Sequence, residues 1–85
     1  MTLSLSHLSA LPRAERCAAI TASVPAHVAN AMFALLARCD WRKLKAADLK
    51  DIARDEATSI LARNPDAWWQ AQAEGLRRLA EVVED

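Results

Sequence analysis

The sequence of 85 residues is poor in the residues that build sheets and turns. It has one Gly, no Tyr and one Phe, with only three Ile, four Val and three Thr. Strands need β-branched and aromatic residues and their turns need Gly, so these scarcities exclude a sheet protein. Ala alone supplies 19 residues, and Ala, Leu, Arg, Glu and Lys are the strong helix formers. The sequence therefore predicts an all-α protein, a compact bundle of four to five short helices that contains a helix-turn-helix.

Cysteine and histidine are also scarce, and their spacing argues against a metal site. Cys17, Cys39, His7 and His27 form no CxxC or HxxxH pair of the kind that binds zinc. Both Cys lie among Ala and Leu, where a free thiol behaves as a small buried hydrophobe. The sequence also lacks an apolar run of about 18 residues that could span a bilayer, and it lacks a basic, cleavable leader. We expect a cytoplasmic protein without a metal, a disulfide or a membrane segment.

No pattern of a catalytic or cofactor site is present. Gly75 is the only Gly, which leaves no phosphate-binding loop and no G-x-S-x-G nucleophile elbow. We expect one helical domain over residues 1–85 that is not an enzyme and uses no cofactor or small-molecule substrate. A chain of this length buries only about 60–65% of its unfolded surface, so oligomerisation would help to stabilise it.

Proline marks the expected helix boundaries. Pro12 and Pro25 suit the first turns of helices over about 12–22 and 25–38, a tightly connected pair that is a second candidate for the helix-turn-helix. The residue before a proline is disfavoured in a helix, so Asn64-Pro65 should end the third apolar-periodic region. The last helix should run over about 66–83. Before all of these, Leu3, Leu5 and Leu8 predict a short helix or a strap across the core.

The region 46–64 allows two interpretations. It is either one amphipathic helix or two helices with a bend near Asp55 to Ala57, which would move Glu56 away from the edge of the apolar face. The stretch from Leu49 to Arg54 is similar to the first helix of many bacterial helix-turn-helix repressors. Such repressors usually follow it with Gly and an apolar residue, where this chain has Ala57 and Thr58, so both interpretations stay open.

Charge is unevenly distributed although the formal net charge is zero. Residues 1–54 carry eight bases and four acids, a net charge of +4, and residues 55–85 carry three bases and seven acids, a net charge of −4. A positive pole of this kind could bind the phosphates of double-stranded DNA. The residues expected to contact phosphates are Arg42, Lys43, Lys45, Lys50 and Arg54, and those expected to approach base edges are Thr58, Ser59 and Arg63.

The last helix carries the expected dimer interface. A heptad-like seam recurs there at intervals of three and four residues, through Trp69, Gln72, Leu76, Leu79 and Val83. Trp41, Trp68 and Trp69 could stack on bases or contact a protein partner. Because Trp68 and Trp69 point about 100° apart on a helix, we expect one in the core and the other at a subunit interface.

The chain as a whole resembles the KorC-like transcriptional repressors of broad-host-range IncP-type plasmids. The strings that carry the resemblance are Met1-Thr2-Leu3-Ser4-Leu5-Ser6, Leu11-Pro12-Arg13-Ala14-Glu15-Arg16-Cys17 and Asn64-Pro65-Asp66-Ala67-Trp68-Trp69. The resemblance implies a helix-turn-helix repressor that acts as a homodimer on palindromic operators of plasmid genes. The alternative is a small helical inhibitor or adaptor that binds a protein, as anti-CRISPR-like proteins do, through the Trp pair or the second apolar face of 25–38.

Overall fold

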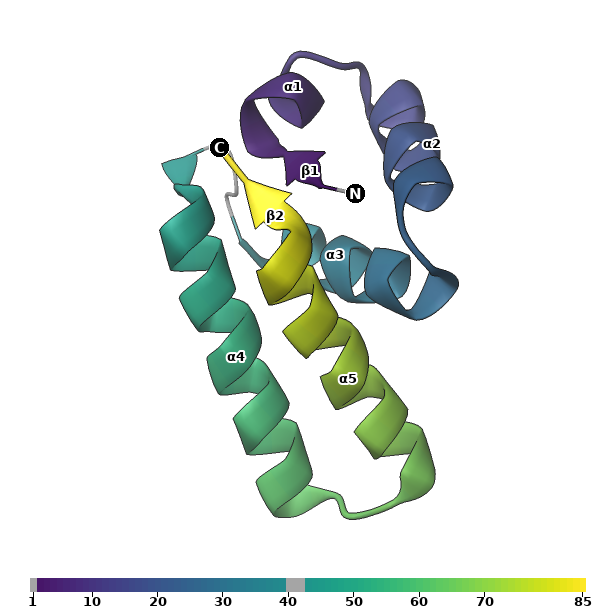
Figure 1. Ribbon diagram of the computed structural model, residues 1–85, viewed down its shortest axis with the longest axis vertical. Helices are drawn as coiled ribbons and strands as arrows, with labels where there is room; N and C mark the ends of the chain where they lie inside the picture. The colour runs from purple at the N-terminus through teal and green to yellow at the C-terminus, as the bar shows by residue number, and fades with distance from the viewer. Residues whose placement is uncertain (1, 40–42) are drawn as a thin grey trace.

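Five helices make up most of the chain in a computed structural model, which describes residues 2–39 and 43–85. In chain order the elements are β1 (Leu3–Ser4), α1 (Leu5–Ser9), α2 (Arg13–Ser23), α3 (Ala26–Arg38), α4 (Ala46–Arg63), α5 (Ala67–Val82) and β2 (Val83–Glu84). The all-α class predicted from the sequence is confirmed, as is the order of the helices (Figure 1). The predicted roles of Trp41 and Arg42 fall outside the described residues.

The helices α4 and α5 form a long antiparallel hairpin (Figure 1). α4 is a single continuous helix, so the predicted helix-turn-helix within 46–64 is wrong and the continuous alternative is correct. No bend near Asp55 is needed, because the Glu56 carboxylate at the edge of the apolar face meets Arg38 of α3. Leu61, further along the same helix, is half-buried against the core.

α3 lies across the hairpin and packs mainly on α5. Its buried side chains are small or flexible, namely Val28, Ala29, Ala31, Met32 and Leu35. The closest approach is at Gly75 of α5, where an added Cβ would lie 2.5 Å from the carbonyl oxygen of His27. The absence of a side chain at Gly75 thus permits α3 to contact the backbone of α5.

The two ends of the described chain meet beside the start of α4 (Figure 1). β1 and β2 form a short parallel pair in which Leu3 lies opposite Val83. The backbone N–H of Ala46 donates to the carboxylate of Asp85 over 2.7 Å, and the Ser6 hydroxyl donates to the main-chain oxygen of Asp85 over 2.6 Å. Asp85 therefore satisfies a free N–H group in the first turn of α4 and joins it to α1.

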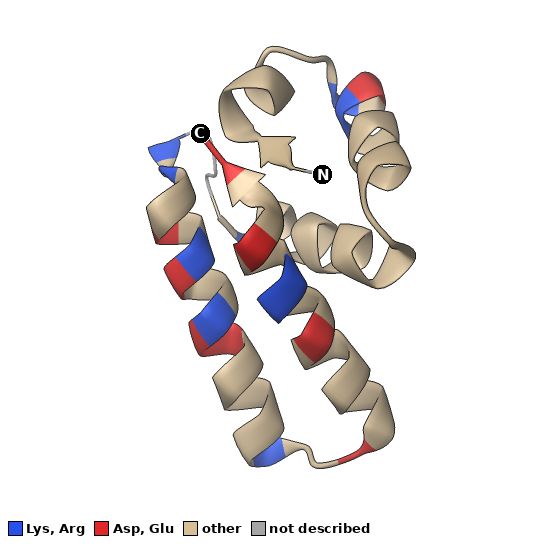
Figure 2. Ribbon diagram, viewed as in Figure 1, with Lys and Arg blue, Asp and Glu red and all other residues tan. Residues whose placement is uncertain are grey.

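This closure brings together charges that are distant in the sequence. Glu84 and Asp85 lie beside the end of α4 that Lys43 and Lys45 precede (Figure 2). Part of the negative charge of residues 55–85 therefore lies next to bases of residues 1–54 in the folded chain.

The predicted dimer seam requires correction. Leu76, Leu79 and Val83 are only 5%, 0% and 2% exposed in the single chain. Their heptad-like spacing serves the contact of α5 with the other helices, so these side chains are not available to a second subunit. Trp69 and Gln72, from the same seam, remain half-buried at the other end of α5.

Candidate binding pocket between α3, α4 and α5

A pocket of about 520 Å³ opens where α3 faces the hairpin of α4 and α5. Its apolar lining consists of Ala31, Ala34, Leu35, Ile60 and Leu76. Its polar and aromatic lining consists of Asn30, Arg38, Glu56, Arg63, Asn64, Trp68, Trp69 and Gln72. A concave site with an apolar floor and a few polar groups is the usual form of a binding site.

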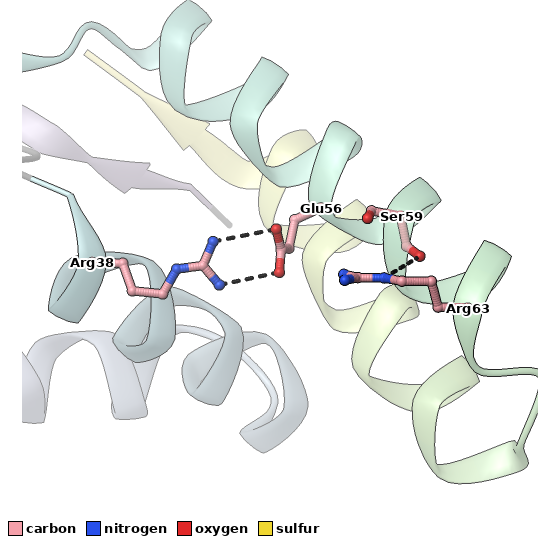
Figure 3. Close-up of polar contacts among 4 residues, drawn as sticks. All are labelled: Arg38, Glu56, Ser59 and Arg63. Carbon is pink, nitrogen blue, oxygen red and sulfur yellow. Dashed lines mark hydrogen bonds and ion pairs between the residues drawn. The ribbon is translucent and has the colours of Figure 1, made fainter.

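An ion pair between Arg38 and Glu56 joins α3 to α4 at this pocket (Figure 3). The two terminal nitrogens of Arg38 donate to the two carboxylate oxygens of Glu56 over 3.1 and 3.2 Å. The hydrogen bond from Arg38 lowers the pKa of Glu56, and its charge acts in the same direction. Arg38 is the last residue of α3, where the helix dipole also favours a cation.

Arg63 brings a second guanidinium to the same wall of the pocket. Its Nε donates to the carbonyl oxygen of Ser59 over 3.3 Å, and its side chain extends back along α4 toward Glu56 (Figure 3). The proximity of Arg63 contributes to the low pKa of Glu56. The three charged groups of the pocket therefore sum to one positive charge.

Trp68 and Trp69 form the aromatic wall. Their ring centroids lie 4.6 Å apart with the planes at 88°, an edge-to-face contact. Trp69 packs on the core, whereas Trp68 is 61% exposed and is the only large exposed hydrophobic residue in the described part of the chain. Neither ring is fully buried, and the one that packs on the core is Trp69, which the heptad-like seam assigns to the subunit interface.

The residues predicted to bind DNA do not share one surface. Lys50 and Arg63 point about 140° apart around α4, because each residue of a helix turns by about 100°. Arg54 lies 3.9 Å from the carboxylate of Asp51. Bases and acids alternate along α4 (Figure 2).

The other residues predicted to contact DNA also lie at different places on the chain. Thr58 is exposed on the side of α4 that carries Arg54, whereas Ser59 is half-buried and lies between Thr58 and the pocket. Lys43 and Lys45 are exposed before α4 begins. Of the seven predicted DNA contacts that the structure describes, only Arg63 lines the pocket.

Protonation of Glu56 is expected to weaken the contact between α3 and α4. The folded-state pKa lies below the usual 4.5, so the stabilisation is complete above about pH 4.5 and is lost as the pH falls through the folded pKa. Glu56→Gln should lower the free energy of unfolding by about 0.5–1 kcal/mol at neutral pH. Urea unfolding at pH 7 and at pH 3 should show a smaller difference from the wild type at the lower pH. An equal loss at both pH values would contradict the ion pair as its cause.

Other candidate sites were sought in the described residues. Cys17 and Cys39 are free thiols and are half-buried rather than fully buried. Over 2–39 and 43–85, no three His, Cys, Asp or Glu side chains are grouped so as to hold a metal ion. Within the same ranges, no helix is long and apolar enough to cross a bilayer.

Comparison with known proteins adds no relative: no protein-family model, curated sequence or solved structure matches this chain. The resemblance to KorC-like repressors therefore stays a prediction from the sequence.

Proposed function

We propose that this chain is a small, non-catalytic protein-binding module of the inhibitor or adaptor class, and that its pocket between α3, α4 and α5 holds a segment of the partner. The observation that carries the proposal is Trp68, which is 61% exposed at the rim of an apolar pocket. Tryptophan and arginine are the residues most enriched among those that dominate protein interfaces, and this pocket contains two of each. We also propose that the protein acts in the cytoplasm, as expected from the sequence.

The pocket is a better candidate than the outer face of α4 for electrostatic reasons. A surface that tracks phosphates needs bases without interleaved acids, whereas Asp51 and Asp55 lie among Lys50 and Arg54 on α4. The pocket instead combines apolar area, which provides most of the binding free energy, with few charges, which fix orientation.

A crosslinking and reconstitution experiment tests the proposal. A photoreactive phenylalanine analogue at position 71, an exposed position one turn from Trp68 on α5, would identify the partner in the cells of origin, and binding would then be measured with the purified partner. Trp68→Ala should weaken that binding by about thirtyfold, the effect of a hot-spot residue worth about 2 kcal/mol. Arg77→Ala, on an exposed position of the same helix outside the pocket, should leave the affinity unchanged.

The thermal stability of both variants should remain close to that of the wild type, since neither side chain is buried. An unchanged affinity of Trp68→Ala for the purified partner would refute the proposal.

A second candidate is the homodimeric, sequence-specific DNA-binding repressor of plasmid genes that the resemblance implies. It is favoured by Lys50, Arg54 and Thr58, which follow one another at intervals of four along one flank of α4. A C₂ dimer would have to place two such flanks about 34 Å apart, one helical turn of DNA. Trp69 and Gln72 are the members of the predicted dimer interface that are not fully buried.

Gel shifts with promoter fragments from the source of the gene test this candidate. A specific complex whose log affinity falls steeply with log salt, and which Lys50→Ala with Arg54→Ala weakens, is expected. No complex at low salt would exclude it.

A further inference from the structure

The two arginines of the pocket differ in what they are free to bind. Each terminal nitrogen of Arg38 already donates to Glu56, and this pair also connects α3 to α4. Arg63 uses only its Nε, which donates to the Ser59 carbonyl within its own helix. Among the described residues, the terminal nitrogens of Arg63 have no protein partner. Arg63 is therefore the cation of the pocket whose terminal nitrogens are both free to donate hydrogen bonds to a ligand.

We propose that the segment bound in the pocket is acidic and apolar, with a carboxylate on Arg63 and a large apolar side chain on the floor beside Trp69. This inference rests on the proposed protein-binding function and specifies the chemistry of the partner. A guanidinium presents two parallel N–H groups that match the two oxygens of a carboxylate. The charge of the pocket, two guanidinium groups against one carboxylate, is complementary to a single negative charge.

Glu56 favours a carboxylate over a phosphate. Its carboxylate lies near Arg63 and stays ionised, as its lowered pKa indicates. One bound carboxylate cancels the net positive charge of the pocket, whereas a phosphate group with nearly two charges leaves an excess of negative charge beside Glu56. The pocket therefore selects against a phosphate group that carries two charges.

The spacing of the pocket sets the spacing of the two ligand groups. Ile60 on the floor and Arg63 at the wall are three residues apart on one face of α4, and the Arg63 side chain reaches back over the turn that carries Ile60. A partner segment that is itself helical also brings residues four apart together on one face. An acidic residue four positions from a leucine on an amphipathic helix would therefore reach both groups.

The probes are two synthetic helical peptides of an Ala/Gln host, one with Glu and Leu four residues apart and one with Gln in place of Glu. Titrations of the full chain, followed by NMR through the indole N–H and arginine Nε–H signals, give the affinities. The Glu peptide should bind about tenfold more tightly than the Gln peptide, as expected for a charge-assisted hydrogen-bonded pair. Arg63→Gln should reduce this ratio to about one, while the matched control Arg77→Gln should preserve it.

Three outcomes of the peptide titrations would overturn the inference. They are equal affinity for the two peptides, a preference that survives Arg63→Gln, and no binding of the Glu peptide at millimolar concentration. Tighter binding of inorganic phosphate than of acetate would do so as well. The proposed function is judged separately: a purified partner that needs Trp68 but is indifferent to Arg63→Gln leaves that function standing and removes only this inference.

Discussion

Gly75→Ala is expected to lower the free energy of unfolding by about 1–3 kcal/mol, the cost of inserting a group into a packed contact. The new Cβ would lie 2.5 Å from the carbonyl oxygen of His27 and 3.1 Å from its carbonyl carbon. Because these are backbone atoms of α3, a side-chain rotation cannot relieve the contact, and α3 must move away from α5. For a domain of this size such a loss lowers the melting temperature by roughly 5–20 °C, measured by circular dichroism.

The sign of this change in stability distinguishes Gly75 from an ordinary glycine in a helix. In an ordinary helix interior, replacing Gly by Ala stabilises by about 1 kcal/mol. Ala71→Gly on the exposed side of α5 is the matched control, and it should lower the stability by about that amount through helix propensity alone. A rise in melting temperature for Gly75→Ala would contradict the close packing of α3 on α5.

Gly75 also illustrates what the sequence predicted and what it did not. Composition and periodicity predicted the helices and the approximate positions of their ends, because Pro12, Pro25 and Pro65 act locally. A lone Gly in a helix predicts only weakened propensity, because the reason for its presence is a carbonyl on a helix distant in the sequence. No local sequence pattern therefore predicts the contact between α3 and α5.

The pocket was partly predictable from a single anomaly. Glu56 lies at the edge of the apolar face of α4, and a carboxylate there calls for a cation from another helix. The bend suggested by the sequence explained the same anomaly within one segment. The structure resolves it between segments, through Arg38 at the end of α3, and this pairing is what places Arg63 in a pocket rather than on an open surface.

A row of apolar residues indicates that this face of a helix packs against another element. It does not indicate whether that element belongs to the same chain or to a second chain. The spacing of Leu76 and Leu79 is the same whether α5 packs on a second chain or on its own core. In this chain the turn at Asn64-Pro65 folds α5 back along α4, so the apolar face of α5 packs within the same chain.

Leu79→Ala distinguishes these two arrangements with a large effect. Leu79 is fully buried within the single chain, so its truncation removes core contacts and leaves a cavity, at a cost of about 2–5 kcal/mol. This cost is a large fraction of the total stability of a small domain, about 5–15 kcal/mol, and the variant should be marginally folded at room temperature.

The decisive measurement is the dependence on protein concentration. For a core residue, the loss of stability in urea unfolding should be the same over about a hundredfold range of concentration, because no association is involved. Leu61→Ala, on a half-buried position of α4, is the control and should lose less. If Leu79 instead held two subunits together, the variant would sediment as a folded monomer, and the difference in stability from the wild type would grow with concentration because only the wild type would gain from association. Either result would show that α5 is an interface helix. It would also contradict the packing of α5 that forms one side of the pocket.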